Sequence, residues 1–251
     1  MMKRASLKAM LVVAVVIYAL TLLWNLPAQF VWNRIAGQLP AQVTPHGLTG
    51  TLWAGQAQRI EVNGIDQGAL AWDWRPSQIF LGRIALDLVW QPRNGRVDGN
   101  LRLGLGSVVL RDVRGQLDAA SMAAMNKAPF ILGGTWLLDV PLLALRDYEF
   151  VEQAQGRLVW QDAAGGLPQP LQLGHLAAEL SGEDDWLIFN LSDQGGPLGL
   201  QGTARWRPGQ PMHIDSRLQA RESAEAGLVG GLGMIGRPDA QGWVSWQAQL
   251  Q

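Results

Sequence analysis

The side chains able to do acid–base or metal chemistry in this sequence are few and poorly spaced for either. The three histidines, His46, His175 and His213, lie far apart, and none has a neighbouring ligand at metal-binding spacing. The acidic run 183–185 places three carboxylates in a row, whereas a calcium loop needs alternating oxygen ligands. No G-x-S-x-G elbow occurs, and no cysteine is available as nucleophile or ligand. We therefore expect no metal, no cofactor and no enzymatic activity.

One segment matches a nucleotide-binding pattern without its context. Residues 231–236 read GLGMIG, which fits G-x-G-x-x-G. That fingerprint requires a preceding strand, a following helix and an acidic residue about 20 positions later. Here only 15 residues follow, and they have strand character. We instead interpret 227–236 as a flexible apolar loop that can lie against a membrane or another subunit. Its candidate contact residues are Gly227, Leu228, Leu232 and Met234.

A glycine followed four positions later by a tryptophan recurs along the chain. In this G-x-φ-x-W pattern, φ is usually apolar, and the three marked positions face one side of a strand. The glycine lets the chain leave a turn or accept a close neighbour. The tryptophans either close the core of the sheet or line a groove for acyl chains or a partner strand. The pattern occurs at 68–72, 156–160, 202–206 and 242–246. Trp53, Trp72 and Trp74 are candidate contact residues.

Alternation of polar and apolar residues dominates the chain beyond its first part, and turn residues separate the alternating segments. This arrangement predicts a mainly β fold built as an antiparallel meander, which is an open curved sheet, a half-barrel or a sandwich. The expected strands are 56–62, 68–74, 83–90, 97–103, 107–117, 134–140, 155–161, 175–180, 185–191, 198–206, 212–220 and 241–250.

Two short helical segments interrupt the predicted strands. Pro76 and Gly82 bracket one helical turn. Residues 118–127 favour a helix that Asp118 caps and Pro129 ends. The seam at 118–132 allows the β domain to be interpreted as two similar halves. These halves are 34–117 and 133–251.

An apolar segment near the N-terminus predicts a transmembrane helix. No charged residue occurs in 9–33, and 25 residues span about 37 Å as a helix, enough for a ~30 Å hydrocarbon core. Basic residues within 1–8 place that start in the cytoplasm, so 34–251 would be periplasmic. A cleaved signal peptide is the alternative, although 26–30 lacks the small-residue cleavage pattern. We expect a single-pass protein of the bacterial inner membrane.

The layout resembles the type II secretion system protein N family, often called GspN. The resemblance rests on the anchor, on LTGTLWAG at 48–55, and on WDWRP at 72–76 leading through Leu81 and Gly82 into the strand at 83–90. It implies an accessory inner-membrane component of the machine that exports folded proteins across the outer membrane. It also implies contact with the inner-membrane platform or the secretin, and no catalysis. The same motifs are similar to those of AsmA-like membrane-anchored β proteins, which are associated with lipid passage.

Two functions fit these features. An accessory scaffold or assembly factor would pair an exposed sheet edge with a strand of another secretion subunit. Alternatively, a β-groove lined by tryptophan, leucine and valine would bind or pass phospholipid acyl chains, each buried CH₂ contributing roughly 0.8 kcal/mol. The formal net charge of −1 argues against nucleic acid, which usually requires a basic stripe.

Overall fold

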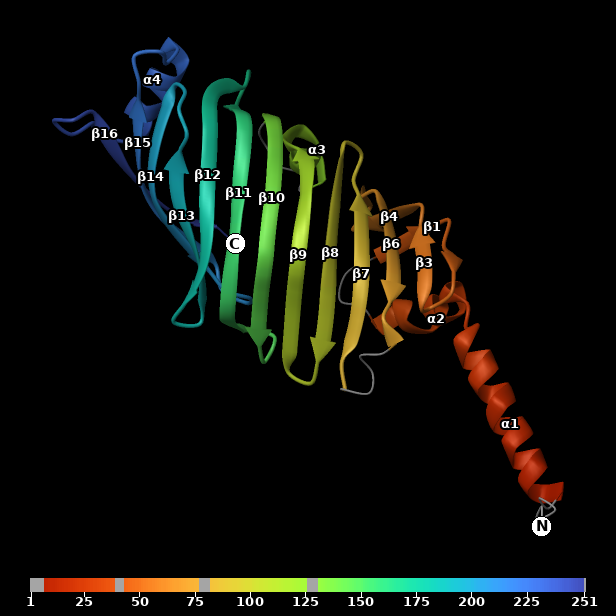
Figure 1. Cartoon of the computed structure of the whole chain (residues 1–251). Coiled ribbons are helices and arrows are strands. Elements are labelled where there is room, and N and C mark those ends of the chain that lie inside the picture. Colours follow the sequence, from red (N-terminus) through yellow and green to blue (C-terminus); the bar gives the residue numbers. More distant parts are fainter. Residues whose placement is uncertain (1–6, 39–42, 77–81, 126–130, 251) are drawn as a thin grey trace. The chain divides into compact units, whose positions relative to one another are not determined.

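The computed structural model describes residues 7–38, 43–76, 82–125 and 131–250 (Figure 1). The chain divides into two compact units. The first unit is Met1–Trp74 and the second is Arg75–Gln251. The boundary therefore lies outside the 118–132 seam. The two similar halves proposed from the sequence stay a prediction.

The first unit begins with two helices instead of one continuous span over 9–33. The first helix ends at Trp24, where the Asn25 side chain donates back to the Thr21 carbonyl over 2.8 Å. Pro27 then takes an extended conformation, with φ −64° and ψ 135°, and precedes the second helix. Proline lacks an N–H and cannot continue a helical ladder, which explains the division. The helices are α1 (Leu7–Trp24), α2 (Ala28–Ile35) and the 3₁₀ helix η1 (Ala36–Gln38).

Within the described part of the chain, no helix combines the length and the apolar character needed to cross a membrane. The transmembrane anchor stays a prediction.

The strands of the first unit form two small antiparallel groups. The segment 56–62, expected to be one strand, divides at Gln58, so its two parts join different groups. The strand expected at 68–74 is confirmed, and it is the longest strand among the described residues of this unit. One group, in the order β1-β4-β5, consists of Val43–His46, Arg59–Val62 and Ile65–Asp66. The other, in the order β6-β3-β2, consists of Ala69–Trp74, Ala54–Ala57 and Thr49–Gly50.

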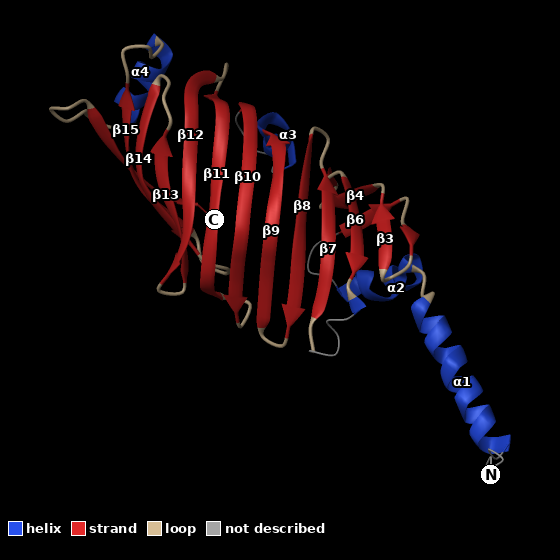
Figure 2. Ribbon diagram, in the orientation of Figure 1, coloured by secondary structure: helices blue, strands red, loops and turns tan. Residues whose placement is uncertain are grey.

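The second unit is an open antiparallel meander whose ten strands lie side by side in sequence order (Figure 2). The mainly β, antiparallel fold is thereby confirmed, and the sheet is open. The strands are β7 (Ile84–Gln91), β8 (Gly95–Gly104), β9 (Ser107–Asp118), β10 (Ile131–Arg146), β11 (Phe150–Gly166), β12 (Leu171–Glu183), β13 (Trp186–Asp193), β14 (Leu198–Trp206), β15 (Met212–Ala220) and β16 (Trp243–Leu250).

The central strands are longer than the sequence pattern predicts. β14 and β15 match their expected bounds, whereas β10 and β11 have 16 and 17 residues. Register shifts between Asp139 and Leu142, and between Trp160 and Ala163, interrupt the strict alternation of these strands. A bulge of this kind changes which face a side chain occupies, so the period-2 pattern breaks while the strand continues.

The helix predicted at 118–127 is present as α3 (Ala119–Met125). An Asp118 carboxylate oxygen accepts hydrogen bonds from the Ser121 backbone N–H at 3.0 Å and from the Ser121 hydroxyl at 2.9 Å. These bonds confirm the cap. Pro129, and the helical turn expected within 76–82 apart from its two ends, lie outside the described residues.

The flexible loop predicted at 227–236 is wrong, because this segment forms the helix α4 (Ala226–Ile235). Its four glycines at 227, 230, 231 and 233 disfavour a helix in isolation. Leu228 and Leu232 lie one turn apart and pack on the sheet, each with 6 % of its surface exposed. Burial of this apolar pair outweighs the glycine penalty.

Strand pairing sorts the side chains of the second unit onto two faces of opposite chemistry. Facing positions on β7 to β11 give the row Leu86, Leu101, Leu110, Leu143 and Ala154. The face that carries this row is called the apolar face. On the opposite face, the polar face, paired positions on β8 to β12 give Asp98, Arg114, Asp139, Arg157 and Glu179.

Candidate functional site

The apolar face is one candidate surface of the second unit. Leu86, Leu101, Leu110 and Leu143 are each half-buried, so part of every side chain still meets solvent. A row of partly exposed leucines across neighbouring strands is characteristic of a surface that binds a partner or a hydrophobic ligand.

The apolar face also contains two tightly packed clusters. The first, with α4 packed on strands β14 to β16, consists of Leu198, Leu218, Leu228, Leu232 and Val244. The second, nearer the middle of the sheet, consists of Val140, Val151, Leu180 and Leu187. These clusters stabilise the sheet, and the half-buried positions between and beyond them are the part available for contact.

The candidate contact residues of α4 divide between core and surface. Leu228 and Leu232 are buried in the first cluster, whereas Met234 is 90 % exposed. At Gly227, a Cβ would lie 2.9 Å from Leu171 Cδ2, so glycine allows the helix to approach β12. The exposed Val229 and Ile235 were not among the predicted contact residues, because a loop, unlike a helix, has no defined faces.

In the first unit, two of the candidate tryptophans, Trp53 and Trp74, form a stack with a third tryptophan, Trp24. The Trp53 and Trp74 rings stack with centroids 4.3 Å apart, and Trp24 stacks on Trp53 at 6.5 Å. Trp53 Nε1 donates to the Leu23 carbonyl over 2.8 Å. Trp74 is 8 % exposed and therefore belongs to the core of this unit. The stack joins the end of α1 to the small β groups, a link that sequence spacing did not suggest.

The third candidate tryptophan explains the glycines of the 48–55 motif. Trp72 pairs across strands with Gly55, where a Cβ would lie 2.6 Å from Trp72 Cζ2. Trp72 Nε1 donates to the Leu52 carbonyl over 3.1 Å. At Gly50, φ is +86°, a conformation that favours glycine. The motif thus builds the tight packing of this unit.

The other tryptophans of the repeated pattern pack in the second unit. Trp136 and Trp160 stack with centroids 4.8 Å apart, and Trp160 Nε1 donates to the Gly133 carbonyl over 2.9 Å. Trp206 and Trp246 pack against the two apolar clusters. These contacts favour the core-closing interpretation of the pattern.

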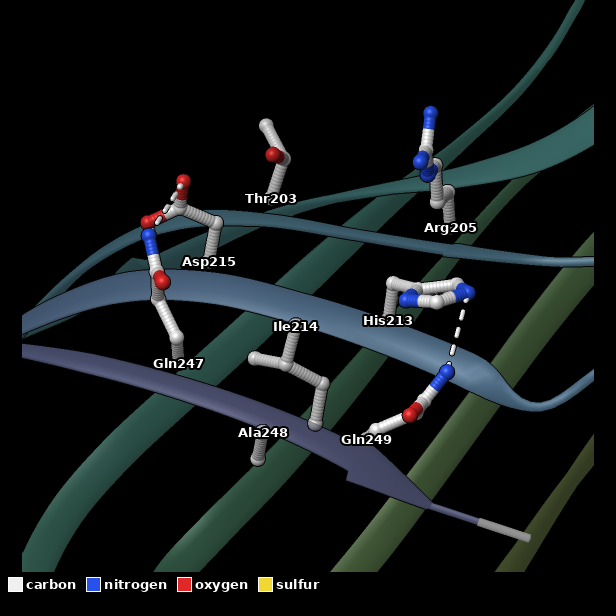
Figure 3. A pocket seen from close by; sticks show the side chains of 8 residues that line it. All are labelled: Thr203, Arg205, His213, Ile214, Asp215, Gln247, Ala248 and Gln249. Carbon is white, nitrogen blue, oxygen red and sulfur yellow. Dashed lines mark hydrogen bonds between the residues drawn. The ribbon is translucent and has the colours of Figure 1, made fainter.

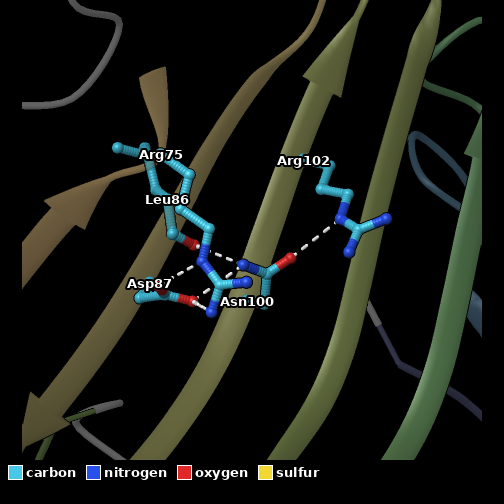
Figure 4. A network of polar contacts seen from close by, with 5 residues as sticks. All are labelled: Arg75, Leu86, Asp87, Asn100 and Arg102. Carbon is cyan, nitrogen blue, oxygen red and sulfur yellow. Dashed lines mark hydrogen bonds and ion pairs between the residues drawn. The ribbon is translucent and has the colours of Figure 1, made fainter. Parts of the chain in front are cut away.

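A paired polar network occupies the polar face of β7 and β8 (Figure 4). Arg75 donates to both carboxylate oxygens of Asp87, at 2.6 and 2.9 Å, and Asn100 Nδ2 donates to the same carboxylate at 2.8 Å. Arg102 Nε donates to Asn100 Oδ1 at 3.0 Å. Burial raises the pKa of Asp87, but the hydrogen bonds from Arg75 and Asn100 and the nearby positive charges outweigh it, so the pKa is below its usual value. These partners hold the two strands in register.

The histidines and the acidic run lie apart, as their spacing suggests. His175 Nδ1 accepts a hydrogen bond from the Asp162 backbone N–H, and Asp185 pairs with Arg146 at 3.1 Å. Among residues 7–38, 43–76, 82–125 and 131–250, no three histidine or carboxylate side chains gather as a metal site would require. The absence of a metal, of a cofactor and of catalysis stays a prediction.

The packing contacts do not show which family the chain belongs to, whereas its similarity to known proteins does. A family model described as "Type II secretion system (T2SS), protein N" matches residues 41–247. The chain belongs to the type II secretion system protein N family. The family resemblance drawn from the anchor and the two motifs is thereby confirmed.

Two relatives named type II secretion system protein N extend this finding over most of the chain. The Vibrio cholerae serotype O1 protein is 27 % identical over 242 residues, covering 90 % of this chain and 91 % of the relative. The Klebsiella pneumoniae protein is 26 % identical over 242 residues, covering 93 % and 91 %. No solved structure matches the chain.

Proposed function

We propose that this member of the protein N family is a single-pass inner-membrane accessory of type II secretion, with residues 34–251 in the periplasm. It would act as a scaffold or assembly factor that docks other secretion subunits, such as the inner-membrane platform or the secretin. Family membership implies the accessory role in type II secretion. The observation that carries the scaffold proposal is the half-buried row of leucines on the apolar face.

The proposed anchor is supported by the exposure of α1. Its large apolar side chains from Met10 to Trp24 are 50 to 66 % exposed, on every side of the helix. A helix that is apolar all round requires an apolar environment, either a protein core or a membrane. The chain at the C-terminal end of α1 contacts the segment 51–53 of the first unit. These contacts favour a retained anchor over a cleaved signal peptide. These contacts are the Trp24–Trp53 stack and the hydrogen bond from the Leu52 N–H to the Leu26 carbonyl, 2.9 Å long.

The anchor is tested by mass spectrometry of the protein extracted from the membrane fraction of cells. A chain that keeps residues 9–33 supports it. A mature chain that begins after Ala28 would show that the segment is a signal peptide.

The scaffold role is tested by secretion of exoproteins from a strain lacking the gene and complemented with variants. Leu110→Gln places an amide on the apolar face, and Arg111→Gln is the matched control because the next residue of β9 faces the other side. We expect secretion to fall with Leu110→Gln and to remain with Arg111→Gln at equal protein levels. Normal secretion from the deletion strain would overturn a required role.

Phospholipid binding is the second candidate function, and the same apolar face favours it. Leucine and tryptophan side chains in adjacent rows offer acyl chains a continuous apolar surface, with each buried CH₂ contributing roughly 0.8 kcal/mol. Purification in mild detergent, followed by lipid analysis, tests it. Stoichiometric phospholipid that decreases in Leu110→Gln and stays in Arg111→Gln supports this function. A lipid-free protein that still restores secretion excludes it.

A further inference from the structure

The polar face holds a second candidate site, at its C-terminal end, which the secretion role does not use. A hollow of about 610 Å³ lies over β14, β15 and β16 (Figure 3). Strand pairing arranges its polar lining in two rows, because residues two apart on a strand share a face. One row is Arg205, His213 and Gln249, and the other is Thr203, Asp215 and Gln247.

Arg205 forms one end of a ladder of alternating cations and aromatic rings. The guanidinium carbon of Arg205 lies 5.3 Å from the Trp186 ring centroid, and that of Arg207 lies 4.7 Å from it. Arg207 also lies 5.6 Å from the Phe150 ring, which Arg146 approaches at 5.6 Å. Stacking of this kind attracts cations to ring faces and restricts their movement. The ladder therefore holds the Arg205 guanidinium in place beside the hollow.

The cations at the two ends of the ladder differ in their partners. Arg146 pairs with Asp185 at 3.1 Å, whereas Arg205 and Arg207 form no ion pair within the described ranges of the chain. Arg207 Nε is buried and, among the described residues, has no hydrogen-bond partner. The ladder thus carries uncompensated positive charge at the end that meets the hollow, where an oxyanion would be favoured.

The other row of the hollow has the opposite character. Gln247 Nε2 donates to Asp215 Oδ2 over 3.4 Å, and in the part of the chain that the structure describes Asp215 forms no ion pair. In the first row, Gln249 Nε2 lies 3.5 Å from His213 Nε2. Successive rows on one strand face are about 7 Å apart. The hollow therefore presents a cationic end at Arg205 and an anionic end at Asp215, on adjacent rows of the sheet.

We propose that this hollow binds a small zwitterion, with a phosphate or carboxylate oxyanion at Arg205 and His213 and an ammonium group at Asp215. Thr203, Gln247 and Gln249 supply further hydrogen-bonding groups beside both ends. The site lies on the face opposite the apolar row, so its ligand is a soluble compound or a free head group, without acyl chains.

The probe is O-phosphoethanolamine, with inorganic phosphate as the comparison anion, titrated into the detergent-solubilised full chain. The ring signals of histidine report binding by NMR, because the chain has only three histidines and His175→Gln and His46→Gln assign them. Arg205→Gln removes the proposed oxyanion contact. Arg157→Gln is the matched control, since Arg157 lies on the same face with β12 and β13 between it and β14.

We expect the His213 signals to move with O-phosphoethanolamine in the wild type and in Arg157→Gln. Arg205→Gln should weaken the affinity at least about tenfold. Asp215→Asn should remove the preference for O-phosphoethanolamine over phosphate. Unmoved His213 signals, or the same shifts in Arg205→Gln, would overturn the site. Equal affinity for the two probes in the wild type would overturn the role of Asp215.

Discussion

The two faces of the sheet in the second unit share one backbone and differ in almost everything else. On the apolar face, neighbouring strands oppose leucine to leucine, as in Leu86, Leu101 and Leu110. On the polar face, Arg114 pairs with Asp139 at 3.0 Å with both side chains more than 60 % exposed. The apolar face gains its energy from burial, whereas the exposed pairs of the polar face contribute little. The comparison teaches that stability resides mainly on the apolar face, which is also the face proposed to contact secretion subunits or phospholipid.

The largest expected effect comes from placing a charge on the apolar face. Val151 is 2 % exposed within the second cluster, so Val151→Asp would bury an unpaired carboxylate at a cost of about 3–5 kcal/mol. Thermal unfolding of the detergent-solubilised protein measures the loss. The neighbouring exposed residue provides the control, and Glu152→Ala should change the stability by less than about 0.5 kcal/mol. If the two substitutions changed the stability equally, the claim that the apolar face determines stability would be contradicted.

Asp193 is an exception on the apolar face, because it is a carboxylate. It lies opposite Leu176 on the neighbouring strand. Burial raises its pKa, but the backbone N–H groups of Leu200 and Gly195 and the charge of Arg221 outweigh this, so the pKa lies below its usual value. Asp193→Asn should lower the stability at neutral pH by roughly 1.5–3 kcal/mol through weakened charged hydrogen bonds.

The loss of stability caused by Asp193→Asn should depend on pH in a definite direction. A carboxylate whose folded-state pKa is lowered stabilises the fold above its unfolded pKa of about 3.9, and that contribution is lost as the pH falls towards the folded-state pKa. The difference in unfolding free energy between wild type and Asp193→Asn should therefore shrink below about pH 4. Denaturant unfolding at a series of pH values measures it, and a gap that widens on acidification would contradict the assignment.

A smaller effect, of opposite sign, is expected on α4. No atom lies within 4 Å of a Cβ built at Gly230, so Gly230→Ala meets no clash and should stabilise the protein by about 0.5–1 kcal/mol. Its control is Gly227→Ala, where the added methyl would lie 2.9 Å from Leu171 Cδ2 and should give less stabilisation or a loss. Thermal unfolding distinguishes them. Destabilisation by Gly230→Ala would show that the helix is not the stable form of this segment.

The smallest effect is expected from the polar face. Arg114→Leu removes the exposed pair with Asp139, and such pairs contribute about 0–1 kcal/mol. Its unfolding temperature should stay close to that of the wild type. A loss as large as that of Val151→Asp would mean that the polar face also determines the fold.

Alternation alone predicted most of the meander, because an antiparallel sheet with unlike faces leaves that pattern in its sequence. β14 and β15 were placed to the residue, whereas the bulges at Asp139 and Trp160 concealed the length of β10 and β11. Residues 9–33 were predicted to form one continuous span, whereas α1 ends at Trp24 and Pro27 precedes a second helix.

The candidate surfaces were harder to predict than the strands. Glycine content suggested a loop at α4, and only the apolar cluster beneath Leu228 and Leu232 makes that segment a helix. The Trp24–Trp53–Trp74 stack joins residues distant in sequence, so no spacing rule could reveal it. The cation ladder around Trp186 was missed for the same reason, since Phe150, Arg146 and Arg207 come from separate strands and loops.

The most direct test of the account is photo-crosslinking in secreting cells from an unnatural amino acid at Leu110 or at Arg111. These neighbours on β9 face opposite sides of the sheet, and Arg111 is the more exposed of the two, so burial of Arg111 would not explain a scarcity of adducts from that position. We predict adducts from Leu110, to secretion subunits if the face is a scaffold or to phospholipid if it holds acyl chains, and few from Arg111. Adducts mainly from Arg111 would contradict the claim that the apolar face is the working surface.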